Sequence, residues 1–166
     1  MASAVLSSDQ DAVRVETFIA APPERVFQAL TDPRQLVQWW GQRGLYRTTE
    51  SQVDLRPGGS WRSAGVNAEG KHFHVEGEYR EVDIPKLIVY TWRKSWMPEV
   101  ETVVRVELAP EGSGTRVLVQ HSGFAGIPDA ARDHGNGWIR VLGWMQAFIE
   151  HGETIDKRPA LTAPVG

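Results

Sequence analysis

The segment from about residue 129 to 151 constrains the fold most, because its apolar residues recur at helical spacing. At about 100° per residue, they fall within one arc roughly 120° wide. These residues are Trp138, Val141, Leu142, Met145, Phe148 and Ile149. Gly152 follows and can end the helix in a left-handed conformation. A long helix with one wide apolar face must pack against a second layer, and the rest of the chain has to supply it.

Residues 49–122 supply that layer as a series of predicted strands. Alternating apolar and polar positions predict strands at about 60–66, 71–83, 86–93, 100–109 and 114–122. The breaks between them are short and rich in glycine and proline, so the strands should be sequential antiparallel neighbours. The alternating stretch 12–19 predicts one more strand near the start of the chain.

Two short helices are predicted between the first strand and the meander. Pro22 and Pro23 are suited to a first helical turn, where a missing N–H costs little. Asp32 followed by Pro33 is a typical N-cap and first position for the second helix. The fold class is therefore α+β: a curved antiparallel sheet of six to seven strands around a long C-terminal helix. Gly65 and Gly77 are the expected bending points of the sheet.

The pattern predicts a single domain over 11–152. Residues 1–10 are small and polar and are expected to be disordered, and 153–166 are expected to form a loose tail. The sequence has no cysteine, which excludes disulfides, thiolate catalysis and zinc–cysteine sites.

The composition limits the classes of partner and cofactor that this chain is expected to bind. The net charge of −3 gives no reason to expect nucleic acid. No apolar run approaches the roughly 20 residues that span a bilayer, and the start lacks a secretory signal, so we expect a cytoplasmic protein without membrane contact. No phosphate loop or dinucleotide fingerprint is present, and no cofactor is expected. A monomer and a homodimer are both compatible with the sequence.

Several short motifs, in this order along the chain, resemble the START-like, polyketide-cyclase-like superfamily. Within it, the chain is most similar to the family named for the activator of heat-shock protein 90 ATPase. The segments are APPERVFQALTDP (21–33), WW (39–40), DLRPGGSW (54–61), GEYREV (77–82), YTW (90–92), GTRV (114–117), HSGF (121–124) and GW (137–138). The resemblance implies a helix-grip fold with a cavity between the sheet and the C-terminal helix. The chaperone activators of the family carry a further N-terminal domain, which this chain is not expected to have.

Seven tryptophans suggest a wide interior to fill or line. Tyr90 and Trp92 are two apart and share a sheet face with Ile88, which predicts that they point inward. Trp40 can line the cavity mouth, although one ring of the Trp39–Trp40 pair can equally fill the core. The predicted cavity residues are Trp40, Trp61, Phe73, Tyr90, Trp92, Val104, His121, Trp138, Val141, Leu142 and Met145.

Two histidines are the candidate polar groups of this cavity. His121 continues an inward series in the last strand, and His134 lies one helical turn before Trp138. Together with Tyr90 they are weak candidates for catalysis. Alternatively, each histidine is held by a nearby backbone group. His72, His74 and Glu76 occupy alternate positions of one strand and so share one face, but that face is more simply the solvated one, so no metal site is predicted.

Three functions remain open at this point. The first is binding of a small apolar or aromatic molecule in the cavity. The second is an enzyme of the cyclase, dehydratase or hydrolase type that uses the cavity histidines and tyrosine. The third, ranked last, is a chaperone co-factor or stress-response interaction protein, which needs an exposed docking patch.

Overall fold

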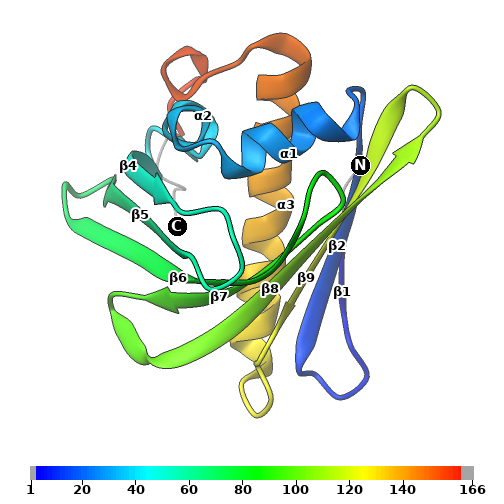
Figure 1. The fold of residues 1–166 in the computed structure, drawn as a ribbon. Helices are drawn as coiled ribbons and strands as arrows, with labels where there is room; N and C mark the ends of the chain where they lie inside the picture. The colour runs from blue at the N-terminus through cyan, green and yellow to red at the C-terminus, as the bar shows by residue number, and fades with distance from the viewer. Residues whose placement is uncertain (1–2, 162–166) are drawn as a thin grey trace.

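A computed structural model describes residues 3–161 and shows a nine-stranded antiparallel sheet that curves around one long helix (Figure 1). The strand order is β1-β2-β9-β8-β7-β6-β5-β4-β3. The elements are β1 (Ser3–Leu6), β2 (Ala12–Ile19), α1 (Pro23–Thr31), α2 (Pro33–Trp39), β3 (Gly41–Gln42), β4 (Tyr46–Val53), β5 (Ser60–Asn67), β6 (His72–Asp83), β7 (Leu87–Lys94), β8 (Met97–Glu111), β9 (Gly114–Ser122), α3 (Pro128–His151) and the 3-10 helix η1 (Ile155–Lys157).

The predicted α+β helix-grip class is confirmed, but the sheet has more strands than the expected six to seven. The additional ones lie at or near its edges. β3 has only two residues, and β1 has four that are mostly exposed. Neither is long or apolar enough to show a period-2 pattern, because edge strands bury little surface.

Both termini are more ordered than expected. The disorder predicted for 1–10 is wrong for residues 3–6, which pair with β2 in the register Ala4 to Val15. The tail predicted as loose over 153–166 contains η1, and Ile155 within it is buried. Residues 1–2 and 162–166 lie outside the described part of the chain.

The helix ends follow the predicted chemistry. The Asp32 carboxylate accepts a hydrogen bond from the backbone N–H of Arg34 at 2.9 Å, with Pro33 in the first turn of α2. Gly152 ends α3 at φ 67°, in the left-handed region that glycine adopts without strain. α1 likewise has proline in its first turn.

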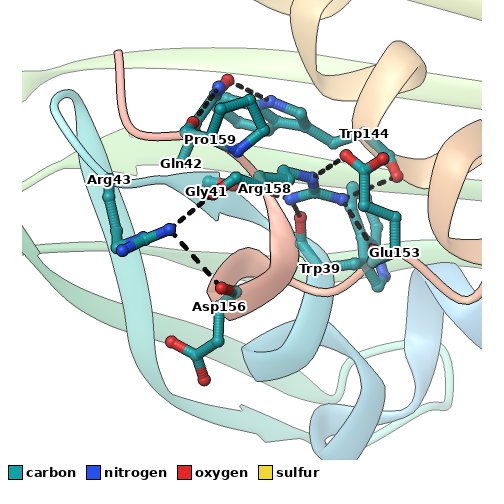
Figure 2. Close-up of polar contacts among 9 residues, drawn as sticks. All are labelled: Trp39, Gly41, Gln42, Arg43, Trp144, Glu153, Asp156, Arg158 and Pro159. Carbon is teal, nitrogen blue, oxygen red and sulfur yellow. Dashed lines mark hydrogen bonds and ion pairs between the residues drawn. The ribbon is translucent and has the colours of Figure 1, made fainter. Parts of the chain in front are cut away.

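The C-terminal segment is fastened by one buried guanidinium (Figure 2). Arg158 is 1% exposed, and its Nε donates to the carboxylate of Glu153 at 3.1 Å. Nη1 donates to the carbonyls of Trp39 and Gly41, and Nη2 to those of Trp144 and Glu153. The five N–H groups of arginine therefore meet five acceptors. Burial lowers the pKa of Arg158, and the Glu153 carboxylate opposes that shift.

Helix α3 does not lie over the middle of the sheet. It packs against β1, β2 and β9, and Gly135 permits a close approach there, since a Cβ would come within 2.7 Å of the Val13 side chain. Trp138, Leu142 and Met145 on the predicted apolar arc are buried. The strands on the other half of the sheet, β4 to β7, are left to face the helix across a gap.

Candidate functional site

That gap contains a cavity of about 920 Å³, walled by β4, β5, β6, β7 and one side of α3. Its polar wall residues include Lys94 and His134, and its rim includes the exposed residues Lys71, His72 and Trp96. The apolar and aromatic residues of the wall are Leu30, Leu36, Trp40, Leu45, Tyr46, Val53, Trp61, Ala64, Phe73, Val75, Tyr79, Tyr90, Trp92, Trp96, Trp138 and Val141.

The aromatic wall is a connected set of rings. Trp40 lies 5.8 Å from Trp138 and 6.3 Å from Trp92, measured between ring centroids. Trp61 meets Tyr90 edge to face at 5.3 Å. Such offset and edge-to-face pairs are favourable beyond their area burial, so the wall is held in shape by its own contacts.

Hydrogen bonds orient the same rings. The indole N–H of Trp61 donates to the carbonyl of Thr91 at 3.0 Å. Gly77 allows this approach, because a Cβ there would lie 1.9 Å from that carbonyl oxygen and 2.7 Å from the Trp61 nitrogen. The N–H of Trp40 donates to the Tyr46 hydroxyl at 3.1 Å. The buried N–H of Trp92, in contrast, has no hydrogen-bond partner among residues 3–161.

The structure divides the predicted cavity residues into two groups. Seven of them line the cavity: Trp40, Trp61, Phe73, Tyr90, Trp92, Trp138 and Val141. The other four are buried but lie away from it: Val104, His121, Leu142 and Met145. The difference follows from the off-centre helix, since its apolar arc serves both the packed half and the cavity half. The periodicity of apolar residues predicts that a side chain is buried, but not whether it faces the packed half of the sheet or the half that lines the cavity.

His121 is a structural hydrogen-bonding residue, not a cavity group. Its Nδ1 lies 3.0 Å from Trp138 Nε1, and an indole nitrogen can only donate. Nδ1 therefore carries no proton, and Nε2–H donates to the Thr102 hydroxyl at 2.7 Å. Burial holds the pKa of His121 well below its ordinary value, so the ring is neutral at pH 7. The expectation that His121 sits at the pocket is wrong, because both ring nitrogens are taken within the core.

His134, in contrast, does line the cavity. Its Nδ1 is 2.9 Å from the carbonyl of Ala130, which can only accept, so the proton of the neutral ring is on Nδ1. The unprotonated Nε2 faces the ammonium of Lys94 at 3.3 Å. Burial lowers the pKa of both residues, while the nearby Asp133 carboxylate opposes the shift in each.

Sequence reasoning missed Lys94, although a signal was present. Tyr90 and Trp92 were predicted to point inward from β7, and Lys94 is the next residue in that alternating series. A cation at the end of an inward row is the residue type that periodicity methods discard as exposed. Tyr46 on β4 was missed because the predicted meander began after it.

The three weak catalytic candidates do not converge on one spot. The rings of His121 and His134 are adjacent, with centroids 4.9 Å apart, but only His134 faces the cavity. Burial raises the pKa of the Tyr90 hydroxyl, which keeps it protonated at neutral pH. Of the three candidates, His134 and Tyr90 line the cavity and His121 does not.

The alternating histidines of β6 do not form a metal cluster. His74 pairs with Glu76 at 3.5 Å on the outer face of the strand, and His72 lies at the cavity rim. Within residues 3–161 there is no group of three or more His, Cys, Asp or Glu side chains that could hold a metal ion.

Comparison with known families agrees with the fold and the motif order. Residues 20–150 match the model of the family described as activator of Hsp90 ATPase homolog 1-like protein. The chain belongs to this family. The family resemblance predicted from the ordered motifs is therefore confirmed. No curated protein sequence matches the chain significantly.

Several solved structures share the architecture. A protein from Chromobacterium violaceum is 27% identical, with a TM-score of 0.73 over 84% of this chain and 97% of its own. A Rhodobacter sphaeroides protein is 21% identical, with a TM-score of 0.79 over 92% of this chain and 100% of its own. An AHSA1-like protein from Aeromonas hydrophila is 23% identical, with a TM-score of 0.69 over 85% of this chain and 93% of its own.

Within the described residues, no helix has the length and apolar character needed to cross a membrane.

Proposed function

We propose that this protein binds a small apolar or aromatic molecule in the cavity between α3 and strands β4 to β7. The observation that carries the proposal is the cavity itself, about 920 Å³ in volume and walled mostly by apolar and aromatic side chains. Binding sites for small molecules have volumes of about 300–1,000 Å³ and are mostly apolar with few polar groups. Space of this size next to a well-packed core is not needed for folding.

The tryptophan rings of the cavity wall are held in place, which favours a preformed binding site over a space that closes in the absence of ligand. Trp61 and Trp40 are fixed by hydrogen bonds to Thr91 and Tyr46, so their rings cannot relax inward without losing a partner. A preformed site loses less side-chain freedom when the ligand binds. The physiological ligand would be a flat or elongated molecule that stacks on these rings.

The alternative of chaperone contact needs an exposed patch on the outer sheet face or at the Trp39–Trp40 corner. The corner does not offer one at Trp39, which is 0% exposed and donates its N–H to the Ala29 carbonyl at 2.9 Å. Trp40 faces the cavity. The corner is therefore a cavity wall.

The proposal can be tested with a neutral fluorescent probe, pyrenebutanol. Tryptophans of the wall should transfer energy to bound pyrene, with saturation at one probe per chain. Gly137 lies on α3 at the cavity, and a Cβ there meets nothing within 4 Å. Gly137→Leu should fill the space and weaken binding at least tenfold.

Gly143→Leu is the matched control for this test. Gly143 lies on the same helix, is exposed and is equally free of contacts. Both substitutions replace glycine inside a helix, which should favour the helix by a similar amount. Equal binding by both variants, or no saturable energy transfer in the unchanged protein, would contradict the proposed function.

A further inference from the structure

One feature of the cavity does not fit a purely apolar ligand, namely the ammonium of Lys94. Its contact with His134 joins two groups that are both basic, at 3.3 Å. Among residues 3–161, Lys94 forms no ion pair with a carboxylate within 4.0 Å. A partly buried cation with a single neutral hydrogen-bond partner keeps donor capacity, since an ammonium has three N–H groups.

The position of this ammonium is set by three elements. Lys94 follows Tyr90 and Trp92 on the inward face of β7, and His134 approaches from α3. The ring of Trp96, in the turn before β8, lies 5.6 Å from Lys94 Nζ. Trp96 is 58% exposed and belongs to the cavity wall. The cation is therefore held at the cavity rim, between an aromatic face and an imidazole nitrogen.

The other charged residues that line the cavity are also mainly cationic. Lys71 and Arg140 also line it, whereas Asp133 is the single carboxylate among its lining residues. An apolar space with a mainly cationic rim complements a molecule that is apolar at one end and anionic at the other. Fields of one sign at a low-dielectric cleft concentrate ligands of opposite charge.

We propose that Lys94 binds the carboxylate of an amphipathic acid whose apolar body occupies the aromatic part of the cavity, and that His134 positions the ammonium for this contact. The inference rests on the proposed function and names its ligand class. The Ala130 carbonyl holds His134 Nδ1–H, which aims the Nε2 lone pair at Lys94. One N–H of the ammonium is thereby engaged, and the other two are available to the carboxylate oxygens.

The test compares two probes that share one body, pyrenebutanoate and pyrenebutanol. Because a hydrogen bond to a charged group contributes more than a neutral one, the acid should bind the unchanged protein about tenfold or more tightly than the alcohol. Lys94→Met should weaken binding of the acid far more than binding of the alcohol and so abolish the preference. His134→Gln should reduce the preference by a smaller factor, which a merely structural role, weakening both probes alike, would not produce.

Lys86→Met is the control for charge alone, since Lys86 is exposed in the turn before β7 and away from the cavity wall. It should keep the full preference for the acid. Equal binding of acid and alcohol by the unchanged protein, or an unchanged preference in Lys94→Met, overturns this inference while leaving the proposed function standing. Failure of both probes to bind overturns the proposed function itself.

Discussion

Two cations near opposite ends of α3 are removed from water to different degrees and are used differently. Arg158, beyond the C-terminal end, reaches five acceptors contributed by α2, β3, α3 and Glu153 in the segment that follows α3 (Figure 2). Lys94, beside the N-terminal half of the helix, has a single hydrogen-bond partner among residues 3–161, the ring of His134. The first arrangement is saturated, whereas the second leaves donors that face a cavity.

The difference separates a structural polar group from a binding group. A buried polar group with every partner in place holds segments together and has nothing left to offer a ligand. A partly buried charge with too few partners raises the energy of the folded protein and is retained where it contacts something else. The contrast predicts that removing Arg158 mainly affects folding and that removing Lys94 mainly affects binding.

The largest effect is expected from Arg158→Met. The substitution removes the Arg158 donor from three buried carbonyls, from the partly buried carbonyl of Glu153 and from the Glu153 carboxylate, so the free energy of unfolding should fall by roughly 3 kcal/mol or more. Urea unfolding followed by tryptophan fluorescence measures it. Arg43→Met is the control, because Arg43 is exposed and donates only to carbonyls of the same tail. A loss below about 1 kcal/mol would mean that the network is not structural.

The second effect is a loss of stability in acid. The folded-state pKa of His121 lies below 6.5, so between the two values the unfolded chain binds a proton that the folded chain does not. This contribution to stability is therefore present above pH 6.5 and is lost as the pH is lowered, by at most about 2 kcal/mol between pH 7 and pH 5 for one histidine.

His121→Gln provides the comparison for the pH experiment. It keeps an amide that can bond to Thr102 or Trp138 but cannot titrate, so the slope of unfolding free energy against pH should decrease. Burial also lowers the pKa of His134, so the unfolding free energy of this variant will still depend on pH to a smaller degree. An unchanged slope in His121→Gln would show that the ring is not held neutral in the folded protein.

A smaller effect is expected from Thr102→Val, which keeps the shape of the side chain. The His121 Nε2–H then loses its acceptor at 2.7 Å, and the free energy of unfolding should fall by about 1–2 kcal/mol. Thermal unfolding of this variant beside Thr49→Val, an exposed threonine on β4, isolates the buried hydrogen bond. Equal changes of the unfolding temperature in the two variants would show that the hydrogen bond between His121 and Thr102 does not stabilise the core.

The smallest change in stability is expected from Lys94→Met. The variant loses one hydrogen bond to a neutral ring but also removes a partly buried charge, so the free energy of unfolding should change by less than about 0.5 kcal/mol in either direction. Calorimetric unfolding of the ligand-free protein measures it. A loss comparable to that of Arg158→Met would abolish the distinction between the two cations.

The elements were predictable where burial leaves a regular pattern. The apolar arc of α3 and the alternation in β2 and β6 to β9 identified the two layers, and Asp32 and Gly152 marked helix ends correctly. The cavity was predicted only in outline, because a position on the inner face can contact either packed atoms or open space. His121 and Leu142 were placed inside correctly, but the tilt of the helix toward β1, β2 and β9 put them in the packed half.

The polar chemistry was harder to predict for a related reason. Lys94 and Arg158 are charged, and single-sequence patterns place charged residues outside. Arg158 is buried because five carbonyl and carboxylate groups far apart in sequence meet at one place, from Trp39 to Glu153. Such contacts between residues distant in sequence form only in the folded chain, so a local sequence pattern cannot predict them.

The off-centre seat of α3 gives the molecule two zones with separate tolerances to change. The helix is anchored on β1, β2 and β9, whereas most of the cavity wall belongs to β4 to β7. Substitutions at wall positions such as Val53, Ala64 or Phe73 can alter the shape of the chamber without disturbing the anchor. A scaffold arranged in this way can acquire new ligand preferences through mutation of one half while the other half preserves the fold.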